Sequence, residues 1–338
     1  MASSAASSTD MSSLVFSPKV SVIIPCFNGS KTLGRAIESV LAQTTKELEL
    51  IIVDDGSTDD SLKVVERYIR DARVILLKND INLGISATKN TAIRAARGEY
   101  VAFLDQDDVW NEDKLEQQLM LFDDPDVYFA YCSVVWRDDS DQFIGRFKFP
   151  MPDSGGQSRR LTSISSANSE ILLAFPIPSA STVIVRRSFL DEYGLLNEKL
   201  YSGDEIELCS RVINKYKVIY DDEPLVCKTV HSGCASNNID RMREARLMLL
   251  DEVVANQPKL RRHENRRRAE IHYQNGLECF RLGRRAQARG DFLKSIRNCS
   301  LRLRYYLAFA LTFDPSGVSA SVARKIKAAL ERFVDTRA

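Results

Sequence analysis

Three aspartates crowd the end of one apolar segment of the chain. Residues 100–110 read Tyr-Val-Ala-Phe-Leu-Asp-Gln-Asp-Asp-Val-Trp, so Asp105, Asp107 and Asp108 follow a run that is typical of a buried strand. Bare carboxylates this close would repel one another, and a divalent cation held between them would remove the repulsion. Oxygen ligands of this kind favour Mg²⁺ or Mn²⁺. A second interpretation stays open, because Asp also favours turns and helix starts, and Asp108 could cap a helix beginning near Glu112.

The elements that must position these acids alternate along the chain. We expect strands over the apolar runs at residues 20–24, 48–53 and 74–77, followed by the strand that carries Asp105. Helix-compatible stretches separate them, at residues 31–42, 61–70 and 86–96, and Gly98 stops the last one. This alternation predicts an α/β fold with a mostly parallel sheet that is buried on both faces.

Four polar loops follow these strands. Because ligands bind beyond the carboxyl ends of parallel strands, the loops should converge on one crevice. They are Pro25 to Asn28, Asp54-Asp55, Asn82 to Gly84, and Asp105 to Asp108.

These segments together resemble the family 2 glycosyltransferases. The resemblance rests on four motifs in order: Val-Ser-Val-Ile-Ile-Pro-Cys-Phe-Asn-Gly (20–29), Ile-Ile-Val-Asp-Asp-Gly-Ser-Thr-Asp (51–59), Asn-Leu-Gly-Ile-Ser-Ala-Thr-Lys-Asn (82–90) and Gly-Glu-Tyr-Val-Ala-Phe-Leu-Asp-Gln-Asp-Asp (98–108). It covers roughly residues 19–237. It implies a GT-A fold, a nucleotide-sugar donor, a divalent metal and inversion at the anomeric carbon.

The resemblance assigns roles to the loop residues. Phe27 would lie against the nucleotide base, with Pro25 and Asn28 in the same donor loop. Asp55 resembles the carboxylate that accepts a hydrogen bond from the base, while Asp54 would orient the loop.

The remaining donor-side positions come from the later motifs. Asp105 and Asp107 match the Asp-X-Asp pair, whose second carboxylate is the expected metal ligand. Gly84 and Lys89 complete the expected donor site. Lys89 stands where the family often has Arg, and so would offer the donor a point charge rather than a planar fork.

A catalytic base is expected at the start of a later helix. Displacement of a nucleoside diphosphate by a hydroxyl needs a carboxylate to take the proton. Residues 202–211 resemble the family segment Glu-Asp-X-Asp-Leu-X-X-Arg, which places Asp204 and Glu205 at the two acid positions with their types exchanged. Glu205 is the expected base and Asp204 the alternative. Both acids would also be favourable at a helix N-terminus without any catalytic role.

A late segment supplies one histidine. Lys228 to Gly233, with Ser236, resembles the family's Arg-X-His segment, so His231 could ligate the metal or contact the diphosphate. The preceding Arg of that segment is not cleanly matched.

Charge divides the 338-residue chain. Residues 241–338 carry 22 Lys/Arg against 10 Asp/Glu, while the preceding part is acidic, so the net charge of +1 hides an asymmetry. The seven Cys show no paired spacing that indicates zinc or a disulfide framework, which fits a reducing cytoplasm. The expected domains are a disordered leader (1–18), a glycosyltransferase domain (19–240, with donor half 19–110 and acceptor half 111–240) and a basic α-helical extension (241–338).

Two regions outside the motifs have weaker signatures. Residues 137–178 are poor in periodicity and rich in Ser, so a loop-rich acceptor segment is expected there. The tail should form four or five helices broken near Pro258, Gly283 and Pro315. Its arginines could be a solvated face, a peripheral contact with the inner face of an anionic membrane, or a protein contact, and no base-reading motif indicates nucleic acid.

The sequence therefore predicts a metal-dependent, inverting transferase that moves one sugar at a time. The donor would be a UDP- or dTDP-sugar, and the acceptor a hydroxyl of a saccharide or lipid-linked glycan in surface polysaccharide synthesis. No run reaches the roughly 18 to 20 apolar residues of a membrane span. Two alternatives are a nucleotidyltransferase of related fold and a non-catalytic nucleotide- or glycan-binding protein.

Overall fold

The computed structural model describes residues 17–147, 161–231 and 238–313. A continuous sheet runs through the first part of the described chain. Its strands are β1 (Val20–Cys26), β2 (Leu48–Asp54), β3 (Val74–Lys78), β4 (Tyr100–Phe103), β5 (Asp108–Trp110), β6 (Val127–Asp138), β7 (Phe143–Arg146), β8 (Leu161–Ile164), β9 (Val183–Arg186) and β10 (Lys217–Val230). The main strand order is β3-β2-β1-β4-β9-β6-β10-β5, with β7 on β6 and β8 on β10.

The pairing is parallel where the polar loops were expected to converge. β1 pairs in parallel with β2 and β4, and β2 with β3, so the carboxyl ends of these four strands share one edge. β9 then runs antiparallel to β4 and to β6, and β6 pairs in parallel with β10. Mixed pairing in the second half thus interrupts an otherwise parallel sheet.

Helices cover both faces of the sheet, which explains the uninterrupted apolar strands. On one face, alternate residues such as Val22 and Ile24 pack against α1 (Leu33–Leu41), α2 (Ser61–Val65) and α4 (Lys114–Leu119). On the other face, Ile23 and Ile51 share a core with α3 (Ile85–Ala95), α5 (Arg187–Tyr193) and α6 (Asp204–Val212). The predicted α/β class with a mostly parallel sheet is confirmed.

The turn before β4 needs a glycine because two strands come close there. A side chain on Gly98 would place its Cβ 2.5 Å from the backbone nitrogen of Ser21 in β1. Instead, the Gly98 N–H donates to Ser21 Oγ at 2.8 Å, and Ser21 in turn donates to the buried Glu49 at 2.6 Å. The absence of a side chain at Gly98 therefore allows β4 to pair with β1 directly after α3.

Several boundaries differ from the sequence predictions. The helix expected over 61–70 ends at Val65, and turns closed by Arg67 and Tyr68 N–H groups follow it. Asp108 begins strand β5, and α4 starts only at Lys114, so the helix-capping interpretation of Asp108 is wrong.

The described part of the segment expected to be loop-rich contains short pieces of strand and a 3₁₀ segment. β6 extends to Asp138, β7 and β8 add short strands, and a 3₁₀ segment (Ser166–Ala174) follows. Backbone pairing to long neighbouring strands supplies the hydrogen bonds that the weak sequence periodicity did not predict. Residues 148–160 of this segment lie outside the described residues.

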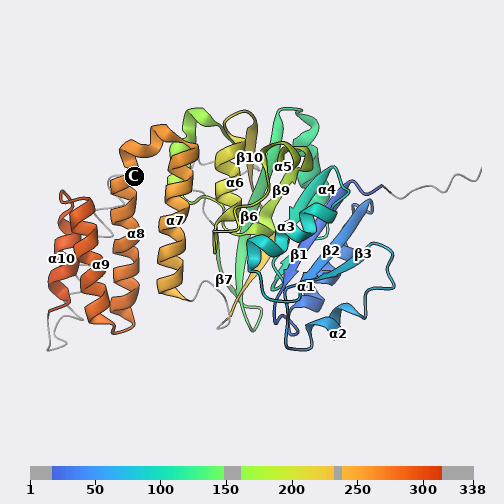
Figure 1. The fold of residues 1–338 in the computed structure, drawn as a ribbon, viewed down its shortest axis with the longest axis horizontal. Coiled ribbons are helices and arrows are strands. Elements are labelled where there is room, and N and C mark those ends of the chain that lie inside the picture. The colour runs from blue at the N-terminus through green and yellow to red at the C-terminus, as the bar shows by residue number, and fades with distance from the viewer. Residues whose placement is uncertain (1–16, 148–160, 232–237, 314–338) are drawn as a thin grey trace, which may run out of the picture.

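The tail forms a row of helices that extends away from the sheet (Figure 1). These are α7 (Ile239–Asn256), α8 (Arg261–Arg281), α9 (Arg285–Asn298) and α10 (Leu303–Leu311), with a 3₁₀ turn at Pro258–Leu260. Two predicted breaks are confirmed, at Pro258 and at Gly283, whose φ is +73°. Pro315 lies outside the described residues, as do the leader residues 1–16. None of the described helices combines the length and hydropathy that a membrane span requires.

The tail contains two different packing environments. Leu249, Leu250 and Val253 of α7 belong to the main core that also contains α3 and α6. A smaller separate core joins α8, α9 and α10, with Tyr273 and Phe292 among its members. Helix α7 therefore packs as part of the sheet-containing body, and the later helices pack largely on one another.

Candidate active site

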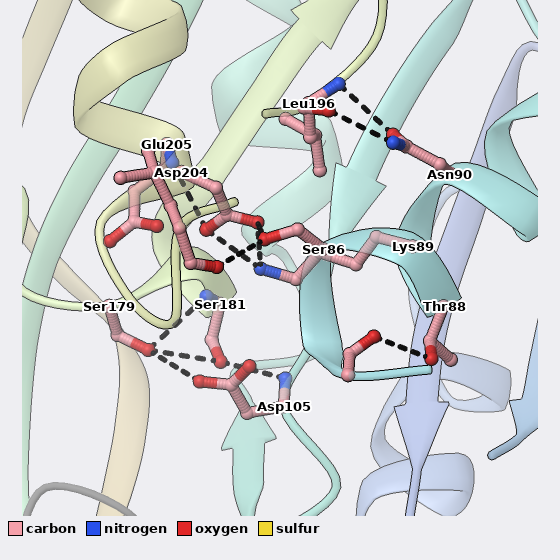
Figure 2. Close-up of polar contacts among 12 residues, drawn as sticks. Ser86, Thr88, Lys89, Asn90, Asp105, Ser179, Ser181, Leu196, Asp204 and Glu205 are labelled. Carbon is pink, nitrogen blue, oxygen red and sulfur yellow. Dashed lines mark hydrogen bonds and ion pairs between the residues drawn. The ribbon is translucent and has the colours of Figure 1, made fainter. Parts of the chain in front are cut away.

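The three aspartates that follow β4 form a compact carboxylate cluster. One oxygen of each, from Asp105, Asp107 and Asp108, lies within 4.8 Å of the others. Ser179 Oγ lies 3.1 Å from both Asp105 Oδ2 and Asp108 Oδ2. Ser181 donates to Asp108 Oδ2 at 2.6 Å. Ser181 Oγ also accepts the Asp105 N–H at 3.0 Å (Figure 2). Two serines from the segment before β9 thus fix the orientation of two carboxylates.

The donor set of this cluster fits a hard divalent cation. Asp105 Oδ1 and Asp108 Oδ1 are buried and have no hydrogen-bond partner among the residues that the structure describes. Unpartnered buried carboxylate oxygens are costly, and a bound cation would satisfy them. Burial raises the pKa of Asp108 to about 7, with Lys228 opposing the rise and Asp105 and Asp107 adding to it. The residues present therefore suit Mg²⁺ or Mn²⁺.

Two residues of the late segment, His231 and Lys228, border the cluster. His231 Nε2 lies 2.9 Å from Asp107 Oδ2, so the expected metal-site histidine is adjacent to the expected metal ligand. Lys228 Nζ lies 3.6 Å from Asp108 and 3.9 Å from Asp105. The Arg that precedes the histidine in the family segment is not cleanly matched in this chain, and Lys228 brings a positive charge to the cluster from β10.

Phe27 is presented to solvent beside the loop that carries the carboxylate cluster. Its side chain is 44% exposed, which is unusual for a large aromatic residue next to a buried strand. Gln106, the middle residue of Asp-X-Asp, holds its backbone in place. Gln106 Oε1 accepts the Phe27 N–H at 3.0 Å, and Gln106 Nε2 donates to the Phe27 carbonyl at 3.1 Å. The base-side loop and the carboxylate cluster are therefore directly connected.

The other donor-loop residues form a hydrogen-bonded framework. Pro25 is buried within β1, while Asn28 is exposed, adopts φ +50° and accepts the Thr58 N–H at 2.8 Å. Asp55 accepts from Asn79 Nδ2 and from the N–H groups of Leu83 and Gly84, at 2.8 to 3.0 Å.

Asp54 and Asp55 both accept hydrogen bonds that hold these loops in place. Asp54 Oδ2 accepts the Ser57 N–H at 3.3 Å, and its Oδ1 is buried without a partner among the described residues. Asp55 accepts three hydrogen bonds from the loop that follows β3. It therefore organises more of the loop structure than the sequence analysis expected. A carboxylate has about four acceptor sites, so Asp55 can accept one more bond.

Lys89 has a different partner from the one that the sequence analysis expected. Its ammonium lies 3.0 Å and 3.2 Å from the two oxygens of Asp204, and both side chains are almost fully buried. The pair joins α3 to the start of α6 (Figure 2). The expected donor-binding charge is therefore already neutralised by one of the two candidate bases.

The pKa values of Lys89, Asp204 and Glu205 are shifted in different ways where α3 meets α6. Burial lowers the pKa of Lys89, but the nearby carboxylates of Asp204, Asp105 and Glu205 together outweigh that effect, and the net shift is upward. Burial raises the pKa of Asp204, but the Lys89 charge and the hydrogen bonds to this carboxylate together outweigh it, and the net shift is downward. Burial and the Asp204 charge raise the pKa of Glu205 well above its ordinary value. Glu205 is therefore the stronger base of the two acids.

Helix α6 starts at a glycine for a packing reason. Gly203 has φ +86°, and a Cβ there would lie 2.5 Å from a Leu249 methyl group of α7. The close approach of α7 thus fixes where the acid-bearing turn begins.

The sequence analysis missed the residues that position the acids. Ser86 and Asn90 lie three residues before and one after Lys89, a spacing that could have indicated a shared helix face. Ser179 and Ser181 had no such signal, because their partners lie more than 70 residues away in the chain.

The chain resembles known sugar transferases. Residues 21–194 match the family model described as "Glycosyl transferase family 2". One curated relative from Escherichia coli, the UDP-Glc:alpha-D-GlcNAc-diphosphoundecaprenol beta-1,3-glucosyltransferase WfaP, is 40% identical over 114 residues, which are 34% of this chain and 45% of that protein. The chain spans about half or less of the length of the first curated relatives that it matches.

Solved structures agree on the fold. The Staphylococcus aureus TarS 1-349 complex with UDP-GlcNAc has a TM-score of 0.58 at 21% identity, covering 86% of this chain and 83% of that one. The mannosyltransferase PcManGT from Pyrobaculum calidifontis, in complex with GDP-Man and Mn²⁺, has a TM-score of 0.57 at 16% identity, covering 87% and 84%. Because the family model covers more than half of the residues and its motifs lie at this crevice, the chain belongs to glycosyl transferase family 2.

Proposed function

We propose that this protein transfers one sugar, with inversion, from a UDP-sugar to a hydroxyl of a lipid-linked glycan, using Mg²⁺ or Mn²⁺. The observation that carries the proposal is that acidic residues from two parts of the chain, the carboxylate cluster after β4 and the start of α6, lie near Lys89. The charges of Asp105, from the carboxylate cluster, and of Asp204 and Glu205, from the start of α6, all act on this one ammonium. This proximity supports a donor-side metal site and an acceptor-side base that act on the same bound substrates.

The donor side would hold the nucleotide and its diphosphate. Phe27 offers an exposed ring for stacking on the base, and Asp55 retains an acceptor site for a base N–H. A cation bound by Asp107 and its neighbours would polarise the diphosphate oxygens and offset the charge on the leaving UDP. UDP is favoured because the WfaP name specifies UDP-Glc and the TarS complex contains UDP-GlcNAc.

The acceptor side would supply the base. The acceptor hydroxyl oxygen forms a bond to the anomeric carbon, the bond from that carbon to the diphosphate oxygen breaks, and the hydroxyl proton passes to Glu205. A single displacement of this kind inverts the anomeric configuration. The raised pKa of Glu205 suits this role, because a stronger base accepts the proton more readily once it is ionised.

A lipid-linked acceptor is proposed from the relatives. The WfaP name specifies a GlcNAc-diphosphoundecaprenol acceptor. A comparable diphosphate-linked sugar would place this protein in the assembly of a surface polysaccharide. The family assignment does not support the nucleotidyltransferase alternative, while the non-catalytic alternative is separable by experiment.

Metal-dependent donor hydrolysis tests the proposal. Purified protein is incubated with UDP-Glc, UDP-GlcNAc, dTDP-glucose or GDP-Man, with Mn²⁺ or with EDTA, and nucleotide release is measured. We expect slow release of UDP that requires the metal and is lost in Asp107→Ala. Asp191→Ala, which changes an exposed aspartate on α5, is the matched control and should behave as wild type. No metal-dependent release from any donor would support the non-catalytic alternative.

A further inference from the structure

One face of α3 makes its polar contacts with a single segment that is distant in sequence. Ser86, Lys89 and Asn90 lie at positions i, i+3 and i+4 of the helix, so their side chains share a face. All three are buried, although all three are polar. Buried polar side chains need partners, and the partners of all three lie within residues 196–205.

The contacts extend along this whole segment. Asn90 donates to the Leu196 carbonyl at 2.9 Å and accepts the Leu196 N–H at 3.0 Å. Ser86 Oγ lies 3.2 Å from the Leu200 carbonyl. Lys89 pairs with both oxygens of Asp204, directly before Glu205 (Figure 2). The face therefore holds the segment at its beginning, its middle and its end.

The acceptor capacity of Asp204 is almost filled by these contacts. Its Oδ2 is contacted by Ser86 and Lys89, and its Oδ1 by Lys89 and the Glu205 N–H at 3.2 Å. Little capacity remains for an acceptor hydroxyl. Lys89 could reach a diphosphate only by leaving Asp204 as an unpaired buried charge, which is strongly unfavourable.

We propose that Lys89 is a positioning residue for the catalytic base: with Ser86 and Asn90 it fixes residues 196–205 through Asp204, so that Glu205 meets the acceptor hydroxyl. This inference rests on the proposed function and deepens it. It assigns Lys89 to the proton-transfer step and removes it from the set of donor-binding residues.

Separate measurements of donor binding and turnover test the inference. Lys89→Met is compared with wild type for UDP affinity by calorimetry with Mn²⁺, and for kcat of sugar transfer. Misplacing a reacting group by about 1 Å can cost about a hundredfold in rate, so we expect kcat to fall by that order. The Kd of UDP should stay within about twofold, since Lys89 does not touch the donor in this proposal.

Arg94→Met is the matched control. Arg94 lies on the same helix and pairs with Glu198 of the same segment at 3.7 Å, but both side chains are at least half exposed. Exposed pairs contribute little, so this variant should keep the wild-type kcat. A large loss of kcat in Arg94→Met would mean that the segment responds to any change on α3, which would overturn the specific role of Lys89.

A double variant tests whether Lys89 acts through Asp204 and guards against misfolding. Lys89→Met/Asp204→Asn removes both buried charges, so it should melt at a higher temperature than Lys89→Met alone. Its loss in kcat should be no larger than that of the worse single variant, because the two residues act as one unit. Multiplied losses would show that Lys89 acts independently of Asp204 and would overturn the inference.

The failure of the inference is distinguishable from that of the proposed function. If Lys89→Met loses UDP affinity by tenfold or more while the wild type binds UDP and transfers sugar, Lys89 is a donor-binding residue and only the inference fails. If the wild type shows neither metal-dependent UDP binding nor transfer, the proposed function fails and the inference fails with it.

Discussion

At the scale of single residues, the most informative side chain is Phe27, because its large exposure is not explained by packing. It is 44% exposed, yet its backbone is fixed by two hydrogen bonds to Gln106. An exposed aromatic ring on a fixed backbone is suited to stacking with little loss of conformational entropy on binding. We propose the nucleotide base as the ligand that stacks on this ring.

Phe27→Ala should therefore weaken UDP binding and leave the fold unchanged. Base stacking on an aromatic side chain contributes about 1 to 3 kcal/mol, which is roughly a 5- to 150-fold increase in the Kd of UDP. Calorimetric titration of UDP with Mn²⁺ measures it. Tyr193→Ala, at a similarly exposed aromatic residue on α5, is the control. An unchanged Kd in Phe27→Ala would return Phe27 to a purely structural role.

The two acids at the start of α6 should differ in their effects on turnover. Glu205→Gln removes the proton acceptor, so kcat should fall by about a hundredfold or more while UDP affinity persists. Asp204→Asn should reduce kcat less. The opposite ranking would identify Asp204 as the base, and small effects from both would place the base elsewhere.

The pH dependence gives a second distinction between these acids. Glu205 acts as a base only when ionised, and its pKa is raised by burial and by the Asp204 charge, while Lys89 opposes the rise. Asp204→Asn removes the raising charge and keeps the opposing one, so the pKa of Glu205 should fall. The acid limb of the kcat profile should then move to lower pH. A shift to higher pH would contradict this account of the pair.

At the scale of elements, the sequence predicted the donor half better than the acceptor half. The strands at 20–24, 48–53 and 74–77 were predicted because each reads as a mainly apolar run. β1 and β2 are buried along their length, and β3, at the edge of the sheet, is partly buried. The helix over 61–70 was predicted too long, and β6, β7 and β8 were not predicted. β7 and β8 are only four residues long, and β7 pairs with β6, while β6 and β8 pair with β10, which begins more than 50 residues after either of them.

The contacts between elements were also beyond sequence reasoning. Residues 89 and 204 are 115 positions apart, and no periodicity connects them. Glu49, the second residue of β2, is fully buried and is held by Ser21 and Arg97 from two other segments. The motifs predicted which residues lie near the carboxylate cluster. Their individual contacts depend on side chains that are far away in the sequence, which the motifs do not indicate.

Helix α7 should stabilise the base-bearing helix through a polar contact at its end. Asn256 Nδ2 donates to Glu207 Oε1 at 3.0 Å and lies 2.9 Å from Ser210 Oγ, both on α6. Asn256→Ala leaves the buried Glu207 with one hydrogen bond fewer, so the free energy of unfolding should fall by about 1 to 3 kcal/mol.

Urea denaturation measures this change. Asn298→Ala, which removes an exposed side-chain bond to the Lys294 carbonyl on α9, should change stability by less than about 0.5 kcal/mol. Equal effects from the two variants would show that the contact between α7 and α6 has no special energetic role.

At the scale of the whole molecule, the chain combines two packing regimes. The sheet and its helices, with α7 included, share the large cores, while α8, α9 and α10 enclose a small separate core. A small core buries less apolar surface and so contributes less stability. A polar network must therefore help to hold these helices together.

That network centres on Asp291 of α9. Asp291 Oδ1 lies 3.0 Å from His272 Nδ1, and its Oδ2 accepts from Asn275 at 2.7 Å and from Arg243 of α7 at 3.2 Å. Burial raises the pKa of Asp291, but the hydrogen bonds and charges of these partners outweigh it, and the net shift is downward. A carboxylate with a lowered pKa stabilises the fold above its ordinary pKa near 3.9 and loses that contribution as the pH falls below it.

Asp291→Ala should therefore loosen the outer helices at neutral pH without changing the crevice. Removing one member of a buried charge network typically costs about 3 to 5 kcal/mol, because Arg243 and His272 lose their partner. Hydrogen exchange read by mass spectrometry should show faster exchange in α8, α9 and α10, while β1 and β2 keep wild-type protection. The Kd of UDP should stay within about twofold, since Asp291 lies in the helical row that extends away from the sheet (Figure 1). Asp240→Ala is the control, because Asp240 pairs with the same Arg243 but is more exposed, and it should change exchange little. Loss of UDP binding in Asp291→Ala would show instead that the tail supports the donor site.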